Sequence, residues 1–328
     1  MTRLSEDALI ARYFAPLATL PGADGLRDDA ALLTPPAGMS LVITADALVA
    51  GVHFLPDDPP ETIAAKALRV NLSDLAAKGA QPYAFTLSLA LPGDWTEAWL
   101  AGFAAGLGRD AEAYGFALIG GDTVKTPGPL TIAVSAFGLV PSARIPRRAG
   151  AAAGDGLYVS GTIGDGAFGL LARRRDAALA GLPAGMREAL ITRYRLPQPR
   201  VALAPVVLAH ASAAMDISDG FVGDLAKLLR ASGASAEVDL AAVPLSPAAR
   251  AAIAGQPRLF EIALTGGDDY EILCAVPAAG CAAFEAQARA AGVAVARIGT
   301  ITAGAAPPLF RDADGAARTF AAGSFSHF

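Results

Sequence analysis

The stretch MDISDGFVGDL, residues 215–225, joins an apolar run to a helical pattern through three aspartates. Apolar side chains recur at helical spacing, at Phe221, Val222, Leu225, Leu228 and Leu229. Gly233 can end this helix, and Asp219 or Ser218 can cap its N-terminus. Exposed N–H groups and the helix dipole at that terminus favour phosphate oxygens. We expect Asp224, further into the helix, to lie on another face as a surface or structural residue.

Strand-like and helical patterns alternate along the rest of the chain. The predicted strands are 30–34, 40–46, 84–91, 116–123 (running into a loop), 130–140, 156–161, 235–240, 260–266, 270–276 and 295–301. The predicted helices are 1–20, 60–78, 94–114, 186–210 with proline interruptions, and 278–291. Prolines and a Gly/Ala-rich run break the pattern near residue 145. We therefore predict an α/β (α+β) protein with domains at 1–145 and 146–328.

Composition narrows the class of protein. Of 328 residues, 53% are hydrophobic and 17% charged, which is typical of a globular chain rather than a disordered one. No apolar run reaches the roughly 18 residues of a membrane span, and the acidic N-terminus is unlike a signal peptide. A net charge of −5 without a basic tract argues against nucleic-acid binding. Two cysteines in no metal or redox spacing fit a reducing cytoplasm.

Several aspartates share one context, in which an apolar run is followed by Asp and then by a small residue. They are Asp28, Asp29, Asp46, Asp74, Asp122, Asp216 and Asp219. Each alone could be a helix cap or a turn residue. As a set they need a counter-charge, and no Lys or Arg joins these motifs except Arg27. Mg²⁺ prefers oxygen ligands and is often shared with phosphates, so we expect the cation to arrive with a nucleotide.

Other phosphate-transfer and metal signatures are missing from the sequence. There is no GxxxxGK[ST] motif, no HRD or DFG signature, and no His/Cys cluster for zinc. The Gly-rich run GTIGDGAFGL at 161–170 stands between a strand and a helix, and alone it is weak evidence for phosphate binding.

Eight motifs in order resemble those of the thiamine-monophosphate kinase family. They are DDAALL (28–33), TADALVAGVHF (44–54), NLSDLAAKGAQP (71–82), LIGGDT (118–123), GTIGDGAFGL (161–170), MDISDGF (215–221), GGDDYEI (266–272) and FSHF (325–328). That family is part of the superfamily of aminoimidazole ribonucleotide synthetase and selenophosphate synthetase. The resemblance extends from about residue 5 to the C-terminus.

The resemblance implies transfer of the ATP γ-phosphate to thiamine monophosphate, with several Mg²⁺ ions and no covalent or acid–base residue. It also implies a homodimer whose N-terminal sheets form a barrel, with sites in the clefts between domains. By matching position, the metal ligands would be Asp29, Thr44, Asp46, Asp74, Asp122, Asp216 and Asp219. The ATP contacts would be Gly121, Asp122, Arg148 and Ser218. The thiamine contacts would be His53, Asp268 and an aromatic residue, Phe325 or Phe320.

Three departures from the family pattern leave alternatives open. Arg27 replaces the usual Gly, Ala45 the usual Thr, and Asp268 the usual Glu. The alternatives to binding are a buried structural role for His53, a solvated position in the linker for Arg148, a turn or cap role for Asp268, and core packing for Phe325. The alternative functions are another ATP-dependent enzyme of the superfamily, such as a selenophosphate synthetase, or a non-catalytic nucleotide or thiamine-phosphate sensor. Because the acceptor is already a phosphate monoester, we predict direct in-line transfer without a phosphoenzyme.

Overall fold

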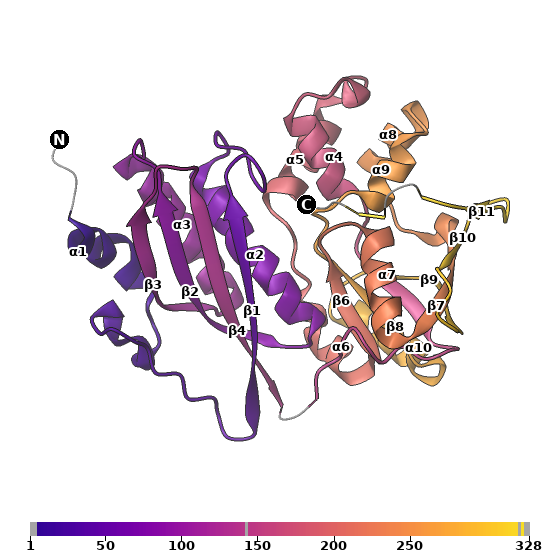
Figure 1. Ribbon diagram of the computed structural model, residues 1–328, viewed down its shortest axis with the longest axis horizontal. Helices are drawn as coiled ribbons and strands as arrows, with labels where there is room; N and C mark the ends of the chain where they lie inside the picture. The colour runs from indigo at the N-terminus through magenta and orange to yellow at the C-terminus, as the bar shows by residue number, and fades with distance from the viewer. Residues whose placement is uncertain (1–4, 142–143, 321–322, 325–328) are drawn as a thin grey trace. The chain divides into compact units, whose positions relative to one another are not determined.

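The computed structural model describes residues 5–141, 144–320 and 323–324 (Figure 1). The described parts of residues 1–75 and 81–143 form one compact unit, and those of residues 76–80 and 144–328 form a second. A short piece of the first half of the chain, residues 76–80, therefore belongs to the second unit. Among the described residues, no helix has both the length and the apolar character needed to span a bilayer.

The first unit is built on a sheet in the order β1-β4-β2-β3. Its strands are β1 (Met39–Val49), β4 (Thr131–Pro141), β2 (Gln81–Leu91) and β3 (Ala117–Lys125). Only the β2–β3 pair is parallel. Helices α2 (Pro60–Ala77) and α3 (Glu97–Tyr114) lie on one face (Figure 1). Side chains of β4 alternate between buried and half-exposed, as expected for a sheet with one covered face.

The N-terminal segment packs on the other side of β3. It begins with α1 (Glu6–Leu9), continues as a π-helix (Ile10–Phe14) and a 3₁₀ turn (Ala15–Leu17), and reaches a second 3₁₀ segment (Pro21–Leu26). Apolar side chains of the segment join a small core with the sheet, formed by Ala18, Leu20, Ala23, Ala31, Leu33, Tyr83, Ala84, Ile119 and Phe137. This packing holds the residues after Leu26 over β3.

The second unit contains a larger mixed sheet in the order β11-β10-β7-β9-β5-β8-β6. The strands are β5 (Gly156–Ser160), β6 (Ala213–Ile217), β7 (Ala234–Asp239), β8 (Glu271–Val276), β9 (Val295–Ala303), β10 (Leu309–Arg311) and β11 (Ala317–Arg318). Every residue of β5, β6 and β8 is buried. These three neighbouring strands are accordingly mostly apolar without alternation, and each also carries one buried polar residue, Ser160, Asp216 or Glu271.

Seven α-helices of the described second unit surround this sheet. They are α4 (Asp165–Arg173), α5 (Ala184–Arg195), α6 (Ala204–His210), α7 (Phe221–Ser232), α8 (Pro247–Gly255), α9 (Leu259–Thr265) and α10 (Cys281–Ala290). Helix α7 buries the predicted stripe of Phe221, Val222, Leu225, Leu228 and Leu229. Gly233 ends it in the left-handed conformation, so the predicted helical stripe and the predicted end of the helix are confirmed.

Three element predictions are wrong. Residues 260–266 form helix α9 rather than a strand, because Leu259, Ala263 and Leu264 are buried together on one helical face. Residues 30–34 form no strand; Ala31 and Leu33 pack against the sheet, whereas Leu32 is exposed. The predicted strand 116–123 is by contrast confirmed, as β3 extends from Ala117 to Lys125. The predicted helix 1–20 is short and irregular, and Pro16 cannot donate to a helical ladder.

Candidate functional site

The loop after Leu26 places two adjacent aspartates above β3. Leu32 donates its backbone N–H to the carbonyl of Gly22 at 2.9 Å, which closes the loop at its base. Asp28 Oδ1 accepts a hydrogen bond from the backbone N–H of Asp29 at 2.8 Å. Arg27 turns away and pairs with Asp24 at 2.8 Å. Both carboxylates are exposed. Arg27, the cation nearest to them in the sequence, is bonded to Asp24 and not to either of them.

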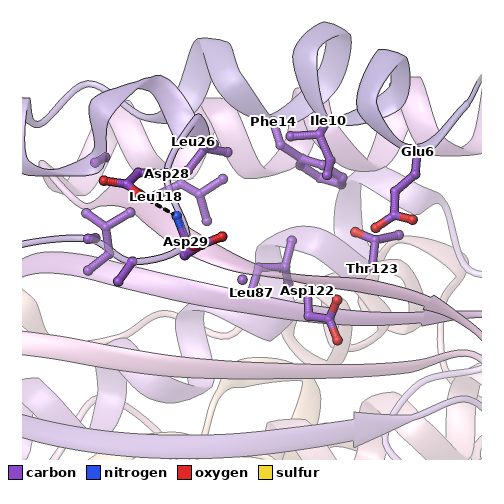
Figure 2. Close-up of a pocket in the computed structure, with 16 residues that line it drawn as sticks. Glu6, Ile10, Phe14, Leu26, Asp28, Asp29, Leu87, Leu118, Asp122 and Thr123 are labelled. Atoms are coloured by element: carbon purple, nitrogen blue, oxygen red, sulfur yellow. Dashed lines mark hydrogen bonds between the residues drawn. The ribbon is translucent and has the colours of Figure 1, made fainter.

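These aspartates line a cavity of about 270 Å³ within the first unit (Figure 2). Figure 2 shows Asp28 and Asp29 on one side and Glu6, from α1, on the other side near Thr123. Asp122, which also lines the cavity, leaves β3 on the opposite side from Thr123. The polar side chains that line the cavity are carboxylates and a hydroxyl, without His or Cys. Such hard oxygen donors suit Mg²⁺ rather than zinc.

Gly121 lets β3 lie close against β2 at this cavity. Its φ is +153°, and a Cβ atom there would meet the carbonyl oxygen of Leu87 at 1.8 Å. The neighbouring Gly120 has far more room, since its nearest obstacle is Thr86 Cγ2 at 3.9 Å. The backbone around Gly121 therefore needs glycine, which keeps the floor of the cavity free of a side chain.

A second pair of predicted ligands meets between β1 and α2. Thr44 Oγ donates a hydrogen bond to Asp74 Oδ2 at 2.5 Å. Asp46 follows two residues along β1, so its side chain leaves the strand on the same face as Thr44. None of these three is among the described residues that line the cavity of Asp28, Asp29 and Asp122. The structure thus brings the predicted ligands of the first unit together as two separate sets.

In the second unit, three Gly-containing loops converge: 161–166, 218–220 and 265–270. Asp268 donates its N–H to the carbonyl of Ser218 at 2.9 Å, and Tyr270 donates to Ile217 at 2.8 Å. Asp268 and Tyr270 have φ values of +72° and +53°, uncommon for residues other than glycine. Strain of this kind is found at binding and catalytic sites, where packing enforces it. Asp268 and Ser218, predicted to contact different ligands, are therefore direct neighbours.

Asp269 fixes the first of these loops to the third. The carboxylate is buried, and it accepts hydrogen bonds from the N–H groups of Gly164 at 2.7 Å and Gly166 at 3.0 Å. Burial raises the pKa of Asp269 to about 8, against the lowering effect of these two N–H groups. Its neighbour Glu271 is also buried and pairs with Arg193 and Arg200. The sequence prediction named Asp268 and missed both of these anchoring acids.

The loop that carries Ser218 and Asp219 is held by Asp224. Asp224 Oδ2 accepts hydrogen bonds from the N–H groups of Ser218, Asp219 and Gly220 at 3.1, 3.0 and 3.2 Å. The N-cap of α7 is Gly220, with no side-chain cap. The predicted capping by Asp219 or Ser218 is therefore wrong, because Asp224 satisfies the free donors from inside the helix. Asp224 is fully buried and structural; a surface position for it is excluded.

A lysine supplies the counter-charge that the sequence reading did not find. Lys227 Nζ donates to Asp219 Oδ2 at 2.5 Å and to Asp224 Oδ1 at 2.8 Å. Burial lowers the pKa of Lys227, but its hydrogen bonds to both carboxylates outweigh this and the net shift is upward. Burial raises the pKa of Asp224 and Lys227 lowers it only in part. The pair is ionised, because an ammonium and three N–H groups all favour the carboxylate. The helical spacing of Asp224 and Lys227 was the signal available in the sequence.

The remaining predicted residues occupy varied places. Asp216 is buried on β6, one residue before Ile217 ends the strand. His53 lies in the turn after β1, where its Nδ1 accepts a hydrogen bond from the N–H of Val49 at 3.0 Å. Arg148 is exposed, and its carbonyl accepts from Ser232 Oγ at 3.0 Å. That contact is at the C-terminal end of α7, about 18 Å along the helix from the Ser218 loop.

The two aromatic candidates for the thiamine contact have different positions. Phe320 is half-buried and packs edge-on against Phe310, with ring centroids 5.0 Å apart. Phe310 in turn contacts Phe221 at the start of α7. Ser324 packs against Gly223 in the first turn of the same helix. The C-terminal segment therefore passes close to the Ser218 loop, while Phe325 itself lies outside the described residues.

The carboxylate oxygens of the candidate site fit Mg²⁺ ions that are bound partly by the protein and partly by a phosphate-bearing ligand. In the described parts of the chain, no group of three or more His, Cys, Asp or Glu side chains is arranged to hold a metal ion by itself. Magnesium sites of phosphate-transferring proteins use one or two carboxylates together with substrate phosphates and waters. The cavity lined by Asp28, Asp29 and Asp122 has the carboxylates for such a site, and so does the Thr44–Asp74 pair with Asp46 on the same face of β1.

Comparison with known proteins identifies the family of the chain. The models of the AIR synthase related protein N-terminal and C-terminal domains match residues 27–140 and 152–309. A thiamine-monophosphate kinase of Caulobacter vibrioides is 46% identical over 299 residues, which cover 90% of this chain and 83% of the relative. A crystal structure of thiamine-monophosphate kinase from Stenotrophomonas maltophilia is 40% identical, with a TM-score of 0.80 and 89% and 91% of the chains covered.

A further solved structure was determined with ligands. It is AaThiL complexed with AMPPCP and TMP, 30% identical to this chain, with a TM-score of 0.78 and coverage of 100% of this chain and 99% of the other. The two AIR synthase related domains, the shared fold and the identity over most of both chains agree. The chain belongs to the thiamine-monophosphate kinase family of the AIR synthase related proteins.

Proposed function

We propose that this chain catalyses transfer of the γ-phosphoryl group of ATP to thiamine monophosphate, giving thiamine diphosphate and ADP. The observation that carries the proposal is the match along its whole length to AaThiL, which was solved with AMPPCP, an analogue of ATP, and with TMP. The ordered aspartate motifs support it further. They supply carboxylate and hydroxyl oxygens in the first unit, which suit Mg²⁺ shared with phosphate-bearing ligands.

Residues of both units have roles in this reaction. Asp29, Thr44, Asp46, Asp74, Asp122, Asp216 and Asp219 would hold Mg²⁺. When bound, Mg²⁺ supplies positive charge that offsets repulsion between the two phosphate-bearing ligands. Gly121 would contact the nucleotide through its backbone, and Ser218, Asp122 and Arg148 through their side chains, since the N–H and carbonyl of Ser218 are already bonded to Asp224 and Asp268. His53, Asp268 and Phe325 or Phe320 would contact the thiamine ligand.

The reaction depends more on positioning the two ligands than on activating the attacking oxygen. The attacking group is a phosphate oxygen of thiamine monophosphate, which is ionised at neutral pH and needs no strong base. Catalysis therefore depends on orienting donor and acceptor for an in-line displacement and on charge stabilisation. The γ-phosphorus–oxygen bond to ADP breaks as the bond to the acceptor oxygen forms, and the leaving oxygen departs as part of ADP. We accordingly assign no covalent intermediate on the protein.

We also infer that the enzyme is a cytoplasmic homodimer. The face of the first sheet opposite α2 and α3 presents small and apolar side chains on β1, with Ile43 63% exposed. β1 is a long edge strand whose exposed side chains are small or apolar. Another chain can cover such a surface. A cytoplasmic site is consistent with the use of ATP and with the two free cysteines, Cys274 and Cys281.

The decisive experiment measures ADP and thiamine diphosphate formed from Mg·ATP and thiamine monophosphate. We expect turnover by the wild type and a loss of about 100-fold or more in Asp46→Asn and in Asp219→Asn. Asp94→Asn is the matched control, because this exposed aspartate of the first unit does not line the cavity. If the wild type binds both ligands and forms no product, the chain is a sensor and the proposed activity is wrong.

A further inference from the structure

The ammonium group of Lys227 lies between two carboxylates of very different exposure. Its hydrogen bonds to Asp219 and Asp224 measure 2.5 and 2.8 Å. The Asp224 side chain is 0% exposed, whereas that of Asp219 is 39% exposed and that of Lys227 is 32% exposed. The lysine therefore joins one buried acid with one acid that solvent, and hence a ligand, can reach.

Of the two bonds, only the one to Asp219 is free to exchange. Asp224 holds the backbone of Ser218, Asp219 and Gly220 through one oxygen and Lys227 through the other. A buried carboxylate that loses its cation is strongly destabilised, so the Asp224–Lys227 pair must persist. Asp219 is partly hydrated and loses much less when its lysine partner is replaced. Another cation can therefore compete for Asp219 while Lys227 stays bound to Asp224.

We propose that Lys227 is a resident counter-ion of Asp219 that Mg²⁺ has to displace. The inference rests on the proposed function, since it takes Asp219 as a magnesium ligand. A fixed positive charge a few ångströms from the carboxylate repels a divalent ion and lowers the affinity of Asp219 for Mg²⁺ alone. The phosphates of a nucleotide offset that repulsion. Lys227 thereby makes Mg²⁺ binding at Asp219 depend on the nucleotide.

Calorimetric titration of the full-length protein with MgCl₂, without nucleotide and at constant ionic strength, tests this role. We expect Lys227→Gln to bind Mg²⁺ roughly tenfold more tightly than the wild type. Lys227→Arg keeps the charge and should match the wild type. Arg230→Gln is the matched control, because it removes one exposed positive charge from the same helix. The increase in Mg²⁺ affinity should vanish in the Asp219→Asn/Lys227→Gln double variant. This would show that the tighter binding takes place at Asp219.

A second variant guards against misfolding. Lys227→Gln leaves Asp224 buried without its cation, so Asp224→Asn/Lys227→Gln is tested in parallel; it removes both charges and keeps an oxygen acceptor for the loop. It should show the same gain in affinity. Unchanged or weaker Mg²⁺ binding in the folded variants overturns the inference, whether or not the wild type makes thiamine diphosphate. If the gain depends on Asp219 while the wild type has no kinase activity, the inference stands and the proposed function fails.

Discussion

At the scale of single residues, buried acids organise the loops of the second unit. Asp269 accepts hydrogen bonds from Gly164 and Gly166, and its pKa is raised to about 8 by burial. An unfolded Asp titrates near 3.9. Between about pH 4 and 8, the folded protein therefore holds a proton that the unfolded chain has released. This contribution to stability is fully present below about pH 4 and is lost as pH rises through about 8.

Asp269→Asn should remove this pH dependence. Relative to the variant, the wild type should lose about 2 kcal/mol of unfolding free energy between pH 5 and 7, where each pH unit is worth at most about 1.4 kcal/mol. Urea denaturation at pH 5, 6 and 7 measures it. Asp239→Asn, which alters an exposed cap, should give a pH profile parallel to that of the wild type. Parallel profiles for Asp269→Asn as well would mean that Asp269 is ionised throughout.

What the sequence reveals at this scale depends on how local a contact is. The spacing of Phe221, Leu225 and Leu228 was enough to predict a buried helical stripe. The bond between Asp219 and Lys227 spans eight residues, and it forms only because the loop before α7 folds back over the helix. Asp269 lies more than one hundred residues from Gly164 in sequence, so no local pattern could pair them.

At the scale of elements, β3 shows how one glycine position shapes a cavity. Gly121→Ala should lower the unfolding free energy by about 3 kcal/mol, because a Cβ would collide with the Leu87 carbonyl at a backbone angle that disfavours side chains. Gly120→Ala has room for its methyl group and should change stability by less than about 1 kcal/mol. Thermal and urea unfolding of the two variants give the comparison. Equal losses would show that Gly121 is not under this constraint.

Element predictions succeeded where periodicity and environment agreed. Helices α2 and α3 and strands β1, β2 and β4 lie within a few residues of their predicted ranges. Residues 259–265 form a helix although Phe260, Ile262 and Leu264 alternate as in a strand, because helical packing buries Leu259 and Ala263 as well. Short strands β10 and β11 were missed, since two or three residues carry no measurable period.

At the scale of the whole molecule, the described residues of the first unit leave part of its sheet uncovered. Thr44 and Asp46 point toward the helix-covered face, and the alternate positions Ile43, Ala45 and Ala47 are exposed. The N-terminal segment covers the face only over β2, β3 and part of β4, through residues such as Leu20 and Leu33. The family resemblance predicted a dimeric barrel here, and sequence alone could not show which residues of β1 stay open.

Ile43→Asp tests whether this face pairs with a second copy. Placing a carboxylate at the centre of an apolar interface costs several kcal/mol, so we expect dimer dissociation to become easier by about 100-fold. Sedimentation or light scattering across a concentration series measures the oligomeric state, and circular dichroism verifies the fold. Ile262→Asp is the control, because Ile262 is an exposed apolar residue on α9 of the second unit, 37% accessible, and should leave assembly unchanged. A dimer equally stable in both variants would place the interface elsewhere. A wild type that is monomeric at all concentrations would exclude the homodimer.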